Sequence, residues 1–392
     1  MKKLLFIQVS SRLINSQYTD TKADRYYESI YRLKDGYNKG DHFWEIPLWV
    51  AEIDGFLKDE MYTYFGVIEK DKTLDLNEDY DYILFSVMDV NKQYIQKFIS
   101  NYRGQAEILT GGYTQIEGLK YFRSPRDLAE YLNVPYKYAL NYQHFKDVLT
   151  IPRITLSTGC RHKCKFCTTQ HFLTEKSPSE ILYQAEQISE SLQFKYVYVA
   201  DSTFGQAENH TFLMNAYSVI KRNNPFFEGF IVQTTASQLS KPGFIESLPD
   251  LGVRIVEIGM ESFNNRILRA LNKPARERLI RYAVTALKAQ GIECILNVII
   301  GLPTEGMASY SRTLEYIEES KGDLFALNIY NLALYEESTL GKEIGINTPE
   351  DSNELSSDKS FGNKKHAQYF YDHIFDLGMD ILGKHEYEPL KI

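Results

Sequence analysis

The chain has few cysteines and no long apolar run, and both shortages narrow its possible functions. Only four cysteines occur among 392 residues, so a disulfide framework of the kind found in small secreted proteins is not expected. No run approaches the roughly 20 apolar residues of a membrane span. The apolar start of the chain turns polar at Ser10, too soon for a signal sequence. We therefore expect a cytoplasmic protein without a membrane partner.

Basic runs are also missing. The formal net charge is −8, and no lysine and arginine run of the kind that follows a phosphate backbone stands out. Composition thus gives no support to nucleic acid as a partner. With 392 residues the chain is long enough for two domains and can bury a large core.

Three of the four cysteines lie in one short segment. Cys160, Cys164 and Cys167 are spaced at i, i+4 and i+7. They directly follow the short apolar run at 154–159, so a loop after a strand carries all three thiols. Zinc sites and iron–sulfur clusters usually take four protein ligands, whereas Cys294 lies far along the chain in an apolar stretch. The local set therefore supplies three ligands and leaves one iron of a [4Fe–4S] cluster open.

Zinc is an alternative occupant of this segment, with His162 or His171 as the fourth ligand of a Cys3His site. The segment lacks the paired Cys-x-x-Cys halves that are typical of zinc modules, which favours the cluster.

The Cys-x-x-x-Cys-x-x-Cys spacing, with Phe166 before the last cysteine, resembles the radical S-adenosylmethionine (SAM) superfamily. The resemblance implies that the methionine part of SAM chelates the open iron. It also implies that an electron from the cluster cleaves the sulfonium to give a 5′-deoxyadenosyl radical. The cofactors supply this chemistry, and the protein positions and shields them. Because only one further thiol exists, we expect a single cluster.

From residue 151 the sequence follows a strand–helix pattern. Strands are predicted at 154–158, 196–201, 229–234, 254–260, 292–300 and 324–330, and helices at 178–193, 209–223, 241–248, 264–271, 275–290 and 307–320. Six such units predict a (β/α)6 partial TIM barrel over 151–334, which is also the fold that the resemblance implies. The carboxyl ends of its strands should share one rim. Residues 335–392 are predicted to form a loop and a docking helix at 367–382.

The first third of the chain predicts a second α/β domain. Its buried-strand patterns are at 3–9, 61–68, 82–88 and 106–110. Because helix-length segments separate these later strands, a doubly wound, Rossmann-like sheet is expected. We place this domain at 1–133, with residues 10–40 as a loop or irregular helix, and a linker at 134–150. Ligands of such sheets bind at the carboxyl ends of the strands.

The layout of this domain resembles the cobalamin-binding domain fused to one class of radical SAM enzymes. The segments that carry the resemblance are Asp-Tyr-Ile-Leu-Phe-Ser-Val-Met at 81–88 and Ile-Leu-Thr-Gly-Gly-Tyr at 108–113. It implies cobalamin contacts from Ser86, Gly111, Gly112 and Tyr113. The Asp-x-His-x-x-Gly motif of the wider cobalamin family is absent, so no histidine of that motif should ligate cobalamin from below.

Residues at the ends of the barrel strands match further superfamily motifs. The segment 200–205 resembles an Asp-containing variant of Gly-Gly-Glu, 259–262 resembles Gly-x-Glu-Ser, and 301–305 resembles Gly-Leu-Pro-x-Glu. Because an unpaired Glu261 would be costly to bury, we expect it to contact a ligand or to form a salt bridge with Arg254 or Arg266. The resemblance implies a SAM site made of Phe166, Asp201, Ser202, Thr203, Gln233, Glu261, Ser262, Asn297 and Ile299.

These patterns predict a radical SAM enzyme, with cobalamin-dependent methylation of an unactivated carbon as its leading function. The expected partners are a small-molecule or peptide substrate and an electron donor such as flavodoxin or ferredoxin. Two alternatives stay open. One is a cobalamin-free mutase, epimerase or cyclase with a degenerate N-terminal domain, and the other is a non-catalytic iron–sulfur or zinc protein. No catalytic side chain beyond the cofactor ligands is identified.

Overall fold

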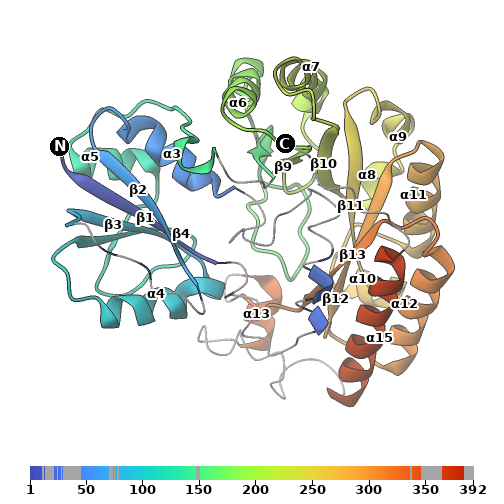
Figure 1. The fold of residues 1–392 in the computed structure, drawn as a ribbon. Coiled ribbons are helices and arrows are strands. Elements are labelled where there is room, and N and C mark those ends of the chain that lie inside the picture. The colour runs from blue at the N-terminus through green and yellow to red at the C-terminus, as the bar shows by residue number, and fades with distance from the viewer. Residues whose placement is uncertain are drawn as a thin grey trace. The chain divides into compact units, whose positions relative to one another are not determined.

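The computed structural model describes residues 1–10, 46–69, 79–146, 151–335, 338–345 and 364–383, with a few single residues between 13 and 76. The chain divides into two units (Figure 1), one made of 1–24, 37–152 and 186–194, the other of 25–36, 153–185 and 195–392. Most of the predicted loop at 10–40, the end of the predicted linker at 147–150, and residues 346–363 lie outside the described residues. The domain boundaries at 133, 150 and 334 stay predictions.

A five-stranded parallel sheet forms the centre of the first unit. Its strands are β1 (Lys3–Val9), β2 (Tyr62–Ile68), β3 (Tyr82–Val87), β4 (Glu107–Gly112) and β5 (Lys120–Tyr121), in the order β2-β1-β3-β4-β5. β1 is almost entirely apolar and buried, as is typical of a parallel strand covered on both faces. The strand order reverses between β1 and β3, which places the topological switch point there. The Rossmann-like sheet is confirmed.

The described part of this unit contains three α-helices and one short 3-10 helix. They are α3 (Leu48–Leu57), α4 (Asp89–Asn101), α5 (Pro125–Leu132) and the short 3-10 helix η1 (Gln143–Phe145). Ser124 caps α5, because its hydroxyl accepts a hydrogen bond from the Asp127 N–H at 3.2 Å and the Asp127 carboxylate accepts one from the Ser124 N–H at 3.1 Å. Pro125 fits the first turn, where no N–H is needed.

A six-stranded parallel sheet forms the centre of the second unit. Its strands are β6 (Arg153–Ile154), β9 (Tyr196–Val199), β10 (Gly229–Thr234), β11 (Val253–Glu261), β12 (Glu293–Ile300) and β13 (Ala326–Asn331), in the order β13-β12-β11-β10-β9-β6. Since neighbouring strands follow one another in the chain, every crossover has the same sense and every carboxyl end lies on one rim. The predicted (β/α)6 partial barrel is confirmed.

Helices connect these strands (Figure 1). They are α6 (Pro178–Ser191), α7 (Leu213–Asn223), α8 (Ala236–Leu239), α9 (Phe244–Ser247), α10 (Asn265–Ala270), α11 (Glu277–Ala289) and α12 (Met307–Ser320). The C-terminal helix α15 (Lys364–Leu382) docks as predicted, because its Phe370 is buried and stacks on Tyr310 of α12 with ring centroids 4.5 Å apart.

Several predicted elements differ from the structure. The single strand predicted at 154–158 is wrong, because Gln184 of α6 bonds both the N–H and the C=O of Thr155 at 3.0 Å and thereby ends the pairing with β9. The helix predicted at 209–223 begins as the 3-10 helix η2 (Glu208–Phe212), and that predicted at 241–248 is only α9. The predicted loop after 335 contains α13 (Thr339–Ile344), capped by the Ser338 hydroxyl.

Two tyrosines cover the outer edge of β13, the last strand of the sheet. The Tyr26 hydroxyl donates to the Leu327 carbonyl at 2.6 Å and accepts from the Leu327 N–H at 2.8 Å. The Tyr27 hydroxyl does the same for Ile329, accepting from its N–H at 3.0 Å. Successive phenols therefore take the hydrogen-bonding positions that a further strand would take.

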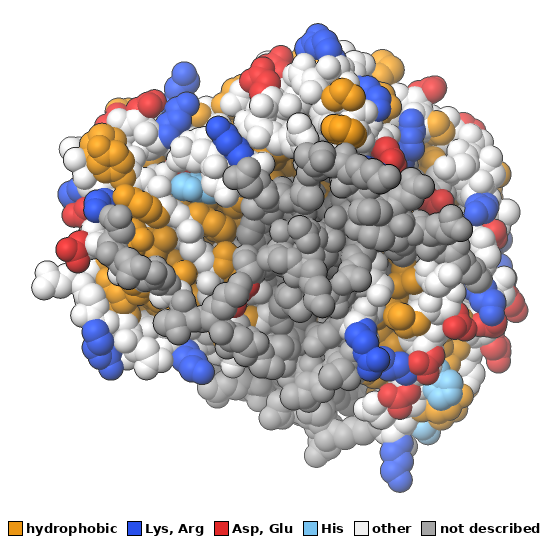
Figure 2. All heavy atoms as spheres, in the orientation of Figure 1, with side chains coloured by type: hydrophobic (Ala, Val, Ile, Leu, Met, Phe, Trp, Pro, Cys, Tyr) orange, Lys and Arg blue, Asp and Glu red, His pale blue; other side chains and the backbone are white. Residues whose placement is uncertain are grey.

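The surface carries charges of both signs. On the face drawn in Figure 2, basic and acidic side chains of the described residues intermingle over α12 and α15. Ion pairs such as Arg281–Glu319 and Arg312–Glu277 join neighbouring helices there. Among the described helices, none combines the length and the apolar composition needed to cross a membrane.

Candidate active site

The three clustered cysteines lie on the loop between β7 (Ser157–Thr158) and β8 (Thr174–Glu175), which pair as an antiparallel hairpin. The Cys160 N–H donates to the Gln170 carbonyl at 2.8 Å and closes the loop. All three cysteines are free thiols, as is Cys294 in β12. The disulfide alternative is therefore absent from this structure.

The three thiols lie within electrostatic reach of one another. Burial raises the pKa of the Cys164 thiol to about 11, and the charges of Cys167 and Cys160 add to this shift while the Lys273 ammonium opposes it. Cys160 is buried, and its Sγ lies 3.4 Å from the Thr203 Oγ1. This contact brings a predicted SAM-site residue next to a predicted cluster ligand.

Main-chain hydrogen bonds fix the cysteine loop to two later segments. The Lys165 N–H donates to the Leu271 carbonyl at 2.9 Å, and the Lys165 carbonyl accepts from the Leu340 N–H at 2.7 Å. The Asn272 side-chain amide donates to the Lys163 carbonyl at 2.8 Å. The loop is thus held by the turn after α10 and by the start of α13.

Glu261, at the end of β11, forms a buried ion pair with Lys273. The salt bridge expected with Arg254 or Arg266 is wrong, because the turn after α10 returns Lys273 beneath the strand end. Glu261 adopts a left-handed φ of 64°, where the β11–β12 register shifts between Gly259 and Glu261. A Cβ atom at Gly259 would lie 2.6 Å from the Lys273 Nζ, so a larger residue there would displace the ends of these two side chains.

The charge of Lys273 is balanced by the anionic groups around it. Burial lowers the pKa of Lys273, but Glu261, Cys164 and Cys167 together outweigh burial and raise it. The Nζ atom also lies 5.7 Å from the centre of the Phe166 ring. Lys273 is therefore a protonated side chain at the cysteine loop, which sequence reasoning missed.

Asp201, a predicted SAM residue, bonds the start of the cysteine hairpin. Its Oδ1 accepts from the N–H groups of Leu156 and Ser157, both at 2.9 Å, and the Ser157 hydroxyl donates to its Oδ2. Burial raises the pKa of Asp201, and these hydrogen bonds oppose the rise. Both oxygens thus shape the chain between β6 and β7. Ser202 beside it is exposed.

The two predicted amide residues, Gln233 and Asn297, bond to neighbouring strands. The Tyr198 hydroxyl lies 3.3 Å from the Gln233 Oε1 and 3.1 Å from a carboxylate oxygen of the buried Glu257. The Asn297 Oδ1 accepts from the Asn328 amide at 3.0 Å. Glu257 and Asn328 were not predicted as site residues. Their only sequence signal is that each is a polar residue within a buried strand, β11 or β13.

Ser262 meets the last residue of the Gly-Leu-Pro-x-Glu segment. Its hydroxyl donates to the Glu305 Oε1 at 3.2 Å, and the Leu302 N–H donates to the Oε2 at 3.1 Å. Burial raises the pKa of Glu305 to about 8, against the lowering effect of these hydrogen bonds. Glu305 therefore joins the loops that follow β11 and β12.

The two apolar SAM candidates, Phe166 and Ile299, come together in one apolar cluster. Phe166 packs against this cluster, whose buried members are Ile267, Leu271, Ile299, Leu302, Leu332, Leu334 and Leu340. The cluster reaches from the cysteine loop to β12, the strand that carries the SAM candidates Asn297 and Ile299. An apolar surface of this kind suits a planar base.

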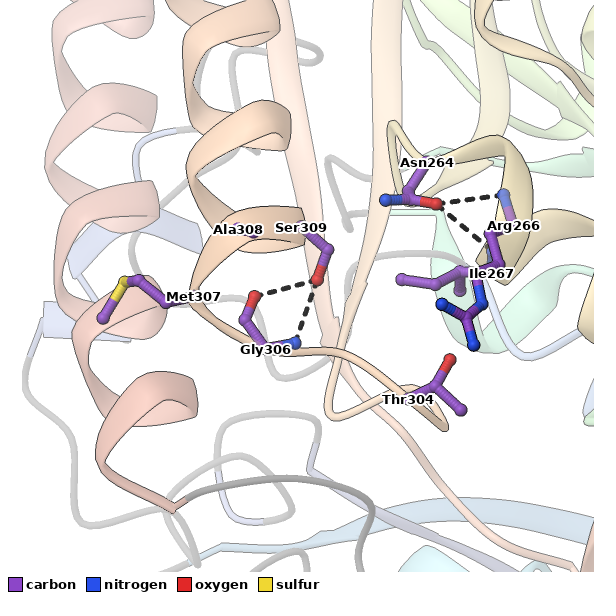
Figure 3. Close-up of a pocket in the computed structure, with 8 residues that line it drawn as sticks. All are labelled: Asn264, Arg266, Ile267, Thr304, Gly306, Met307, Ala308 and Ser309. Carbon is purple, nitrogen blue, oxygen red and sulfur yellow. Dashed lines mark hydrogen bonds between the residues drawn. The ribbon is translucent and has the colours of Figure 1, made fainter.

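A cavity of about 350 Å³ opens beside these loops (Figure 3). Its lining residues are Asn264, Arg266, Ile267, Thr304, Gly306, Met307, Ala308 and Ser309. Figure 3 shows that the Asn264 side chain is occupied in capping α10, as is Ser309 at the start of α12. None of the lining residues is a predicted SAM residue, but Ile267 also belongs to the apolar cluster around Phe166 and Ile299.

The four cobalamin candidates occupy the carboxyl ends of β3 and β4 in the first unit. Tyr113 is 93% exposed. A Cβ atom at Gly112 would lie 2.4 Å from the Val87 carbonyl oxygen, so this glycine already has a packing reason. Asn91 of α4, which was not predicted, donates to the Ser86 carbonyl at 3.0 Å and orders this edge.

Comparison with known families decides the affiliation of the second unit. Residues 154–317 match the family described as Radical SAM superfamily. Residues 154–317 therefore form a radical SAM domain.

Each curated sequence relative matches 45% of this chain. One relative is the hopanoid C-2 methylase of Rhodopseudomonas palustris, to which this chain is 21% identical over 182 residues. The match covers 45% of this chain and 34% of the methylase. The chain spans 34 to 46% of the length of the curated relatives it matches.

Two solved structures share the fold of both units. The radical SAM methyltransferase TsrM from Kitasatospora setae, with cobalamin and a [4Fe–4S] cluster bound, matches with a TM-score of 0.54 and 11% identity over 88% of this chain and 78% of its own. The cobalamin-dependent radical SAM enzyme OxsB, with aqua-cobalamin and SAM bound, has a TM-score of 0.52 and 15% identity, over 100% of this chain and 57% of its own.

A radical SAM domain implies a [4Fe–4S] cluster and SAM. The donor set fits the cluster, since three free thiols within mutual electrostatic reach share one loop. Within the described ranges, no three His, Cys, Asp or Glu side chains converge closely enough for a single metal ion. This finding includes the three clustered cysteines, so it does not separate zinc from an iron–sulfur cluster.

Proposed function

We propose that this radical SAM enzyme is a cobalamin-dependent methyltransferase that methylates an unactivated carbon of a small molecule or peptide. One observation carries the proposal: the matches to the cobalamin-bound structures extend over 88 and 100% of the chain and so include the first unit. The β2-β1-β3-β4-β5 order of that unit supports it, because such sheets bind ligands at the carboxyl ends of their strands.

Cys160, Cys164 and Cys167 would hold three irons of the cluster. When bound, the cluster and SAM supply a 5′-deoxyadenosyl radical, and cobalamin supplies a methyl carrier. The chain shields this chemistry with the apolar cluster around Phe166 and Ile299, because water and side reactions must be kept from a radical.

The remaining predicted SAM residues divide into two groups in this proposal. Thr203 beside Cys160, and Glu261 beside Lys273, offer polar atoms next to the cysteine loop. Gln233, Asn297 and Ser262 hold hydrogen bonds to neighbouring strands and loops, and Asp201 and Ser202 lie at the β9 end. We propose direct contact for the first group and support of the rim for the second.

The N-terminal edge would receive cobalamin at Ser86, Gly111, Gly112 and Tyr113. Ser86, Gly111 and Gly112 offer main-chain atoms and carry no bulky side chain. No histidine of the lower-ligand motif is present, so the corrin should bind without protein nitrogen from that motif. An electron donor of the flavodoxin or ferredoxin type would complete the system.

A cobalamin-free mutase, epimerase or cyclase is the second candidate. The observation in its favour is that a side chain at position 112 would collide with the Val87 carbonyl. Packing alone therefore accounts for a glycine there, without a bound cobalamin. In that case the first unit would serve as scaffold or lid. The third alternative, a non-catalytic iron–sulfur or zinc protein, differs from both enzymes because it would cleave no SAM.

Cluster binding and SAM cleavage test the enzyme assignment. Anaerobic reconstitution should load about four irons, as for a single [4Fe–4S] cluster, and reduction with SAM should release 5′-deoxyadenosine. Cys164→Ala should lose both, whereas Cys294→Ala, which alters a buried thiol in β12, is the matched control and should keep both. Iron-free protein that retains zinc and cleaves no SAM would contradict the enzyme assignment.

Corrinoid binding tests the methyltransferase itself. After incubation with hydroxocobalamin and gel filtration, the protein should carry a corrinoid absorption spectrum. Gly111→Leu, which places a bulky side chain at the candidate edge, should reduce the bound fraction. Protein that cleaves SAM but retains no corrinoid would favour the cobalamin-free candidate.

A further inference from the structure

The turn after α10 carries a lysine into the cysteine loop, and we propose that the Lys273–Glu261 pair sets the reduction potential of the cluster. In this role Lys273 is a positioning residue that supplies positive charge, and Glu261 limits its effect. The inference rests on the proposed function only in requiring that Cys160, Cys164 and Cys167 bind a cluster.

The turn is attached to the cysteine loop at two points. The Leu271 carbonyl accepts from the Lys165 N–H, and the Asn272 amide donates to the Lys163 carbonyl. Asn272 has a positive φ of 53°, which turns the chain so that Lys273 points inward. The position of the ammonium is therefore coupled to the position of the thiols.

The ammonium is enclosed rather than solvated. Lys273 is 9% exposed and Glu261 is 6% exposed, and the Lys273 Nζ lies 5.7 Å from the centre of the Phe166 ring. The Gly259 position leaves space for both charged groups, since a Cβ there would lie 2.6 Å from Nζ and 2.8 Å from the Glu261 Oε1. A buried charge acts over longer distances than an exposed one because water does not screen it.

Other cations on the loop are placed differently. Arg161 and Lys163 are exposed, so solvent and salt screen their charges. Lys165 pairs with Glu343 at the surface. Lys273 is thus the cation on this part of the described chain whose charge is least screened.

The expected effect follows from the change in charge on reduction. The reductant gives one electron to the cluster, and the total negative charge of cluster and thiolates rises by one. A nearby buried cation stabilises the reduced form more than the oxidised form, which makes the midpoint potential less negative. The Glu261 carboxylate has the opposite effect, so the two side chains should act in opposite directions.

The test is a dithionite titration of the reconstituted protein without SAM, followed by electron paramagnetic resonance. Lys273→Met should shift the midpoint potential to a more negative value, and Glu261→Gln to a less negative one. Lys273→Arg should restore a value close to that of the unaltered protein. Lys163→Met removes an exposed cation from the same loop and should give a clearly smaller shift than Lys273→Met.

Three results separate this inference from the proposed function. If Lys273→Met loads iron and has the same midpoint potential as Lys163→Met, the inference is wrong. If Lys273→Met in addition loses affinity for SAM, Lys273 is a SAM contact instead. If Lys273→Met fails to load iron, the Glu261→Gln variant tests the inference in its place. A midpoint potential of Glu261→Gln equal to that of the unaltered protein overturns the inference. If the unaltered protein binds no cluster, the proposed function fails first and the inference with it.

Discussion

Replacing Glu305 by glutamine is expected to stabilise the protein at neutral and alkaline pH and to leave its stability at acid pH nearly unchanged. Burial raises the pKa of Glu305 from 4.5 to about 8, so between these values the folded chain holds a proton that the unfolded chain releases. The stability that this proton provides is complete below the unfolded pKa and is lost as the pH rises through the folded pKa.

The size of the effect follows from the two pKa values. Their difference is 8 − 4.5, and at about 1.4 kcal/mol for each pKa unit the loss reaches up to about 5 kcal/mol at pH 9. Glutamine stays neutral at every pH. Its carbonyl can still accept from the Ser262 hydroxyl or the Leu302 N–H, which now bond to Glu305.

Urea unfolding of both proteins at pH 5, 7 and 9 measures the difference. The free energies of unfolding should nearly agree at pH 5. The margin in favour of the variant should widen between pH 5 and pH 8, with most of it present at pH 7, and should then level off. Glu246→Gln changes an exposed carboxylate of α9 and should leave the pH profile unaltered. Parallel profiles for Glu305→Gln and the unaltered protein would show that Glu305 is ionised in the folded state and that the reasoning is wrong.

Two further substitutions test structural roles at the predicted edges. Asp201→Asn should lower the free energy of unfolding by about 1–3 kcal/mol, because it replaces one acceptor oxygen facing Ser157 by a donor; an unchanged urea midpoint would contradict this role. Gly112→Ala should cost more than Gly118→Ala. Both glycines have positive φ values, but only a Cβ at Gly112 meets backbone atoms, while one at Gly118 meets nothing within 4 Å. Equal decreases in the melting temperatures of the two variants would refute the close approach of Val87 to Gly112.

The fold could be predicted because its signals are local. Apolar runs gave β1 and β10 their bounds, and the Ser124 and Ser177 caps set the starts of α5 and α6. The parallel order then follows from alternating strands and helices. Short elements could not be predicted in this way, since β6 ends at a side-chain amide from α6 rather than at a turn residue.

The sequence indicated which residues lie near the cysteine loop better than it indicated their contacts. Cysteine spacing places three thiols on one loop, as the structure has them, and Phe166 and Ile299 do share one apolar cluster. Lys273 could not be found, because its significance depends on a turn that brings it to Glu261 twelve positions earlier. Contacts formed through tertiary packing leave no local pattern in a sequence.

The hydroxyl groups of Tyr26 and Tyr27 protect the edge of β13 from pairing with a strand of another molecule. An uncovered parallel edge strand is a template on which a second molecule can add its own strand. Because Tyr26 and Tyr27 occupy the N–H and C=O groups of Leu327 and Ile329, the sheet ends at β13 in the described part of the chain. Phenylalanine at both positions would keep the rings but expose that template, so concentrated protein should then begin to self-associate.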